Sequence, residues 1–111
     1  MGRKARLRPI YLAQKLQQLR LALNLSQDGM IEKMGLTDVL TRSRISEYES
    51  GHEPPLPVLL RYAEVANVIV NVLIDDRLEL PVHLPSPQRS EGIRRTPEKS
   101  QAKSTAKKKK P

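Results

Sequence analysis

The sequence predicts an all-α domain of five short helices between a basic N-terminal arm and a basic, disordered C-terminal tail. Three observations support this prediction. Apolar residues recur at helical spacing in the middle of the chain, and residues typical of helix ends divide that region into five segments. At Pro81 the composition changes to proline, serine and lysine, with too few apolar groups to offset the entropy of ordering. We therefore place the arm at residues 1–8, the domain at 9–80 and the tail at 81–111.

The first three helices follow from apolar stripes with end signals between them. Asn24 suits the left-handed conformation that ends a helix, and Ser26 suits the N-cap of the next one. Gly35 and Gly51 suit the ends of the second and third helices, which are separated by a polar stretch at residues 37–43. The three apolar stripes are Leu12, Leu16, Leu19 and Leu23, then Met30, Ile31 and Met34, then Ile45 and Tyr48.

The fourth and fifth helices complete the predicted domain. Pro55 or Pro57 can occupy the first turn of the fourth helix, where a missing amide proton costs nothing, and Asn67 ends that helix. A short fifth helix is expected near residues 71–76. The β-branched run at residues 68–70 fits a strand as well as a helix. We favour the helix, because the chain has no second strand candidate with which this run could pair.

The net charge of +8 is distributed unevenly along the chain. Residues 1–8 carry +4, residues 9–80 carry −3 and residues 81–111 carry +7. Basic extensions on a mildly acidic domain favour a polyanionic partner, such as nucleic acid or an anionic membrane surface. The alternative is that the charged extensions only keep a small protein soluble.

The composition excludes several classes of function. The absence of cysteine rules out a disulfide scaffold, a Cys-ligated zinc site and a thiolate nucleophile. The two histidines, His52 and His83, are too few for a His-rich metal site, and no Gly-rich phosphate loop is present. We therefore expect no enzyme, no cofactor and no metal. The longest apolar stretch, residues 65–74, spans ten residues and is interrupted by Asn67 and Asn71, whereas a membrane crossing needs about 20. With no signal peptide apparent, we expect a cytoplasmic protein without membrane contact.

Several short motifs occur in a fixed order between residues 12 and 76, and their order is more specific than any one of them. They are Leu16-x-x-Leu19-Arg20, Leu25-Ser26-Gln27, Met34-Gly35, the run from Arg42 to Gly51, Pro55, Leu59-Leu60-x-x-Ala63 and Val68. Together they resemble the Cro/CI-type (XRE-like) helix-turn-helix family. The resemblance implies a Cro/CI-like helix-turn-helix domain that binds double-stranded DNA.

The resemblance also implies which residues contact DNA. The third helix would enter the major groove with its N-terminal residues toward base edges. Arg44 is the strongest candidate, because a guanidinium can bind O6 and N7 of guanine together; the alternative is a solvated helix charge. Glu47 could accept from cytosine N4, and Gln27 would contact phosphate at the start of the second helix. The full set of DNA-contact candidates is Gln27, Arg42, Ser43, Arg44, Ser46 and Glu47.

Other positions are implied to be architectural. Arg20 and Glu49 match two family positions that form an internal salt bridge, and Tyr48 is expected in the core. The sequence departs from the family pattern by an insertion of about four residues at 37–40 or nearby, and by Ile31 in place of the favoured alanine. A larger side chain there would overpack a standard motif by about 1–3 kcal/mol. We expect the longer turn to move the third helix outward and make room for it.

The resulting hypothesis is a sequence-specific DNA-binding transcriptional regulator, a repressor that occupies an operator as the homodimer expected from the family. One alternative is an antitoxin-type interaction module that binds a toxin partner as well as DNA. Another is a nonspecific nucleic-acid binder that acts through its basic extensions. In each case phosphate contacts are expected from the side chains of the two extensions, chiefly Arg3, Lys4, Arg6, Arg8 and lysines 107–110.

Overall fold

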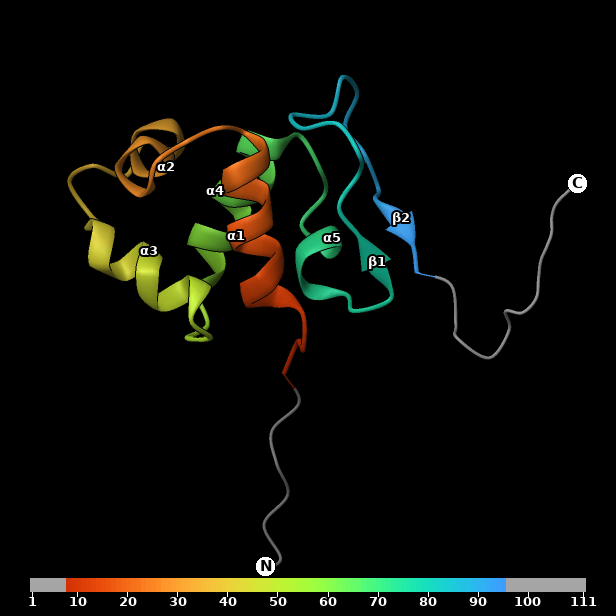
Figure 1. The fold of residues 1–111 in the computed structure, drawn as a ribbon, viewed down its shortest axis with the longest axis horizontal. Coiled ribbons are helices and arrows are strands. Elements are labelled where there is room, and N and C mark those ends of the chain that lie inside the picture. Colours follow the sequence, from red (N-terminus) through yellow and green to blue (C-terminus); the bar gives the residue numbers. More distant parts are fainter. Residues whose placement is uncertain (1–7, 96–111) are drawn as a thin grey trace, which may run out of the picture.

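The computed structural model describes residues 8–95, and these residues form a mostly helical domain, as predicted. The expectations for residues 1–7 and 96–111 lie outside the described residues. Helices α1 and α4 occupy the centre, with α2 and α3 on one side and α5 and two short strands on the other (Figure 1). The elements are α1 (Leu12–Ala22), α2 (Gln27–Met34), α3 (Arg42–Glu49), α4 (Leu56–Ala66), α5 (Asn71–Ile74), β1 (Leu78–Glu79) and β2 (Ile93–Arg94).

A single hydrophobic core is shared by all five helices. Because the chain has no Phe or Trp, its largest fully buried side chain is Tyr62 on α4. Leucine, isoleucine, valine, methionine and alanine fill the remaining volume. The fully enclosed members, with no more than 1% of their surface exposed, include Leu16, Leu19, Met30, Ile45, Tyr62, Val68, Val72 and Leu73.

The helix ends form where the sequence predicts them. The Ser26 hydroxyl caps α2 by accepting a hydrogen bond from the Gly29 amide at 2.9 Å. Gly35 ends α2 with a φ of 73°, and Asn67 ends α4 in the left-handed region with a φ of 59°. Pro55 occupies the N-cap position of α4, so its missing amide proton leaves no helix hydrogen bond unmade.

The predicted pair between Arg20 and Glu49 is confirmed, and it joins α1 to α3. Arg20 Nε donates to Glu49 Oε2 at 2.7 Å, and Nη2 donates to Oε1 at 3.0 Å. Only 12% and 5% of the two side chains are exposed. Arg20 Nη1 also donates to the Leu25 carbonyl at 3.0 Å, so one guanidinium holds α1, the α1–α2 loop and α3 together.

A buried lysine, which the sequence did not single out, joins α1 to the end of α5. Lys15 is 3% exposed, and its Nζ donates to the carbonyl oxygens of Val72 and Asp75 at 2.8 and 3.0 Å. Burial lowers the pKa of this lysine. The ammonium thereby satisfies carbonyls at the end of α5 that no further helical turn could reach.

Residues 81–95, called the C-terminal strap from here on, are ordered against the domain, so the predicted disorder is wrong for this segment. Strand β2, which belongs to the strap, pairs with β1 in antiparallel orientation, with Leu78 opposite Arg94. It also binds the end of α4, where the Ser86 amide donates to the Ala66 carbonyl at 2.9 Å. The composition argument failed because the strap is stabilised by backbone hydrogen bonds to an existing surface, which require few apolar side chains.

The run at residues 68–70 is neither the predicted helix nor a full strand. Val68 forms an isolated parallel bridge with Ser90, and the Ile69 amide donates to the Ser90 carbonyl at 3.0 Å. The strand partner that the sequence seemed to lack therefore lies in the strap. Within residues 8–95, no helix is both long and apolar enough to cross a membrane, and the longest have 11 residues.

The burial of the Arg20–Glu49 pair predicts a large cost for removing one partner alone. Arg20→Met should lower the free energy of unfolding by about 3–5 kcal/mol, because Glu49 is left charged and unpaired in the core. Arg20→Met with Glu49→Leu should recover most of that loss. Urea unfolding followed by circular dichroism measures both.

The matched control is Arg8→Met. It removes an arginine from an exposed pair with Glu53, whose two side chains are 52% and 29% exposed. Its cost should stay below about 1 kcal/mol. An equal loss in the Arg8 and Arg20 variants would contradict the role assigned to the buried pair.

Candidate nucleic-acid interface

The connection between α2 and α3 sets the geometry of the candidate site. After Gly35 the chain reverses, with the Leu36 amide donating to the Ile31 carbonyl at 3.1 Å. The inserted residues then make one further turn, in which the Leu40 amide donates to the Leu36 carbonyl at 2.9 Å. Leu40 is 8% exposed and Ile31 is 3% exposed, and both belong to the one core. The longer turn therefore contributes an anchor of its own, and the larger side chain at position 31 is accommodated.

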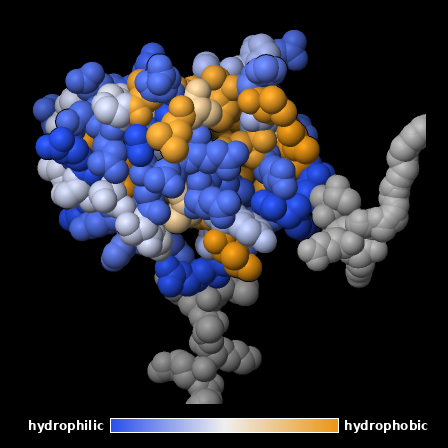
Figure 2. All heavy atoms as spheres, viewed as in Figure 1, coloured by the Kyte–Doolittle hydropathy of each residue, from blue (hydrophilic) through white to orange (hydrophobic). Residues whose placement is uncertain are grey.

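Helix α3 is held from its inner face. Ile45 is fully buried and Tyr48 is 5% exposed, which confirms the expectation that Tyr48 is a core residue. Burial also raises the pKa of the Tyr48 hydroxyl. The exposed side chains on the outer face are Arg42, Ser43, Arg44 and Ser46. The end of the molecule formed by α2 and α3 is covered mainly by hydrophilic residues (Figure 2).

Each of the two candidate arginines lies beside an acidic side chain of α2 or α3. Arg42 Nη1 lies 3.9 Å from Asp28 Oδ2, which links the start of α3 to the start of α2. Arg44 Nη1 donates to Glu47 Oε1 at 2.9 Å, one turn along α3. All four side chains remain between 45% and 71% exposed. Both guanidiniums are therefore oriented by carboxylates and remain accessible from solvent.

The remaining candidates lie around this pair of arginines. Gln27 is the first residue of α2 and is half-buried, next to the acid that contacts Arg42. The hydroxyls of Ser43 and Thr41 are 3.0 Å apart at the start of α3. Ser46 is exposed farther along the helix, where its carbonyl accepts from the Ser50 hydroxyl at 2.8 Å.

Sequence reasoning missed the roles of Asp28 and Thr41. Asp28 lies in the first turn of α2, where an acidic side chain is favoured by the helix dipole. Its contact with Arg42 depends on how the inserted turn places α3, and no sequence signal specifies that placement. Thr41 precedes a helix, as capping residues do, yet its hydroxyl lies against Ser43 and not on the helix backbone.

The arrangement suits binding to a hydrogen-bonding surface. Arginine, serine and amide side chains are the donors typical of contacts to base edges and phosphates. Within residues 8–95, no group of three or more His, Cys, Asp or Glu side chains could hold a metal ion. His52 is exposed in the turn that follows α3.

Comparison with protein-family models matches residues 16–68 to the helix-turn-helix family. The matched segment begins within α1, contains all of α2, α3 and α4, and ends at Val68. Searches of curated proteins and of solved structures find no match to the chain.

Truncating a side chain on the inner face of α3 should lower the free energy of unfolding much more than truncating one on the outer face. Ile45→Ala should lower the free energy of unfolding by about 2–5 kcal/mol, because it leaves a cavity in the core. Arg42→Ala and Arg44→Ala should each change it by less than about 1 kcal/mol, since their ion pairs are exposed. Urea denaturation of the three variants measures this. If Arg44→Ala lowers the free energy of unfolding nearly as much as Ile45→Ala does, the outer face of α3 contributes to the stability of the domain.

Proposed function

We propose that the protein is a sequence-specific transcriptional regulator of the Cro/CI type that represses by occupying an operator, since residues 16–68 match the helix-turn-helix family. The observation that carries the proposal is the two-faced character of α3. Ile45 and Tyr48 fix its inner face in the core, while its outer face presents arginine and serine side chains to solvent. A helix held in this way can enter the major groove without rearranging the domain.

Each outer side chain receives a role in this proposal. Arg44 binds guanine through O6 and N7, and Glu47 holds its guanidinium in position before contact. Arg42 and Gln27 bind phosphate beside the start of α2, where free backbone amides and the helix dipole favour anions. Ser43 and Ser46 donate to base edges or to phosphate, as serine hydroxyls do in either setting.

The proposal includes the cellular setting and the assembly. The partner is double-stranded DNA in the cytoplasm, bound by a homodimer whose two copies occupy two half-sites. Selection of bound sequences from random DNA supplies the operator, and a palindromic site with a fixed half-site spacing supports the dimer. A selected site without symmetry would favour binding by a single copy.

Arg44→Ala should weaken binding to the selected site by about 1–3 kcal/mol and relax the preference at one base position. The reason is the loss of a bidentate contact that only guanine satisfies. The matched control is Arg89→Ala, which removes an exposed arginine from the strap and the same unit of charge. Fluorescence anisotropy on the selected duplex and on a scrambled duplex gives the specificity ratio. If Arg44→Ala and Arg89→Ala have equal ratios, α3 does not contact bases through Arg44.

A further inference from the structure

The inserted turn between α2 and α3, residues 36–40, exposes one apolar side chain at a polar end of the molecule. Val39 is 70% exposed, and in the described part of the chain no other leucine, isoleucine, valine or methionine between α1 and α4 is as exposed. Single exposed apolar side chains are common on protein surfaces, so exposure alone assigns no role. The position of Val39 is more informative, because it lies three residues before the start of α3 at Arg42.

The inserted turn holds Val39 in place from both sides. The Val39 amide donates to the Leu36 carbonyl at 2.9 Å, and the same carbonyl accepts from the Leu40 amide at 2.9 Å. Leu40 is buried in the core, and Leu36 packs against that core. The β-branched valine side chain is itself stiff at χ1. Its apolar surface is therefore preorganised, and little conformational entropy is lost when a partner covers it.

The inserted turn lies at the same end of the molecule as the start of α3. The chain between α2 and α3 projects from the side of the domain opposite the strap (Figure 1). Because consecutive Cα atoms are about 3.8 Å apart, the Val39 Cα lies within about 11 Å of the Arg42 Cα. This span corresponds to roughly three steps of about 3.4 Å along a DNA strand. A duplex that contacts the outer face of α3 near its start therefore lies close to Val39.

The composition of the inserted turn favours contact with bases over contact with phosphate. Residues 36–40 contain one acidic side chain, Asp38, and no basic side chain. A carboxylate is repelled by phosphate, so the turn is not suited to binding the backbone of DNA. In the major groove, the C5-methyl of thymine is the apolar group that the base edges present, and apolar side chains contact it. The exposed valine therefore matches a thymine.

We propose that Val39 is a further specificity-determining residue, which contacts the methyl group of a thymine in the major groove beside the bases contacted by α3. This proposal rests on the proposed function, because it concerns the same face of the protein and the same partner, double-stranded DNA. It adds a base preference supplied by the inserted turn, where the sequence departs from the Cro/CI-type pattern. The thymine should lie within about five base pairs, half a helical turn, of the position at which Arg44→Ala relaxes the preference.

The test removes the methyl group from the DNA and the valine from the protein, separately and together. Each thymine of the selected duplex is replaced in turn by uracil, which lacks only the 5-methyl group. Binding of the full-length protein, measured by fluorescence anisotropy, should weaken about three- to five-fold at one position, as expected when one methyl group is no longer buried. In Val39→Ser the same replacement should have almost no effect, because the methyl group has already lost its apolar partner.

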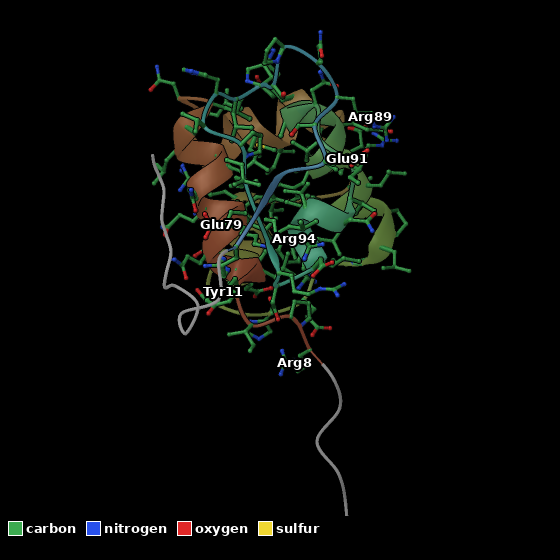
Figure 3. The ribbon with its side chains drawn as sticks, turned by 90° about the vertical axis from the view of Figure 1, so that its right-hand side faces the viewer. Arg8, Tyr11, Glu79, Arg89, Glu91 and Arg94 are labelled. Atoms are coloured by element: carbon green, nitrogen blue, oxygen red, sulfur yellow. The ribbon has the colours of Figure 1, made fainter. Side chains whose placement is uncertain are left out.

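The matched control is Val82→Ser in the strap, which removes a valine that is 79% exposed. Figure 3 views the domain from the side of the strap, where Tyr11, Glu79 and Arg94 lie, whereas α2 and α3 are on the opposite side (Figure 1). The strap is anchored there by Arg95, whose guanidinium lies 4.1 Å from the centroid of the Tyr11 ring. Val82→Ser should therefore bind the selected duplex as the unmodified protein does and keep its full discrimination of thymine from uracil.

The outcomes separate this proposal from the proposed function. Because both valines are exposed, neither substitution should move the midpoint of urea unfolding, so a change in binding does not come from unfolding. Discrimination that persists in Val39→Ser, or that is absent at every position in the full-length protein, would overturn the role of Val39. If a selected duplex depends on Arg44 but shows no coupling between Val39 and a thymine methyl, only this role is contradicted. Failure to select any sequence from random DNA would contradict both proposals.

Discussion

The placement of α3 depends on the buried ion pair between Arg20 and Glu49. A buried pair adds little net stability relative to an apolar replacement, yet it is costly to break, so it favours one arrangement over near alternatives. Here it connects α3 to α1 through two hydrogen bonds, beside the apolar contacts of Ile45 and Tyr48. The position of α3 is therefore fixed by contacts on its inner side, while its outer side chains remain exposed.

The distribution of charge separates two tasks that many DNA-binding proteins combine. On the outer face of α3 each candidate arginine has a carboxylate beside it, Asp28 for Arg42 and Glu47 for Arg44. Such a surface attracts phosphate weakly, and it favours partners that offer hydrogen bonds in the right places. In the proposed complex, α3 supplies the discrimination between sequences, and the basic extensions are expected to supply affinity through phosphate contacts. Salt should then affect the strength of binding much more than its selectivity.

The helices could be predicted because their signals are local. Ser26 and Gly35 each act on backbone groups within a few residues, so their roles follow from their own neighbourhoods. The strap could not be predicted, because its hydrogen bonds join Ser90 to the chain beside Asn67 across more than twenty residues. Composition rules treat a segment in isolation and do not register the surface on which it lies. The contact between Asp28 and Arg42 could not be predicted either, because it depends on how the inserted turn places α3 against α2.

The contact between Tyr11 and Arg95 joins the residue before the first helix to the residue after the last strand. The first helix of the domain begins where its last strand ends, with the Arg95 guanidinium 4.1 Å from the Tyr11 ring centroid. Domains whose ends lie together tolerate circular permutation and insertion into a host loop, because neither operation stretches the chain. Joining Tyr11 to Arg95 with a short linker and opening the chain at the exposed turn around His52 is therefore expected to preserve the core. A domain with distant ends would tolerate these two operations less well.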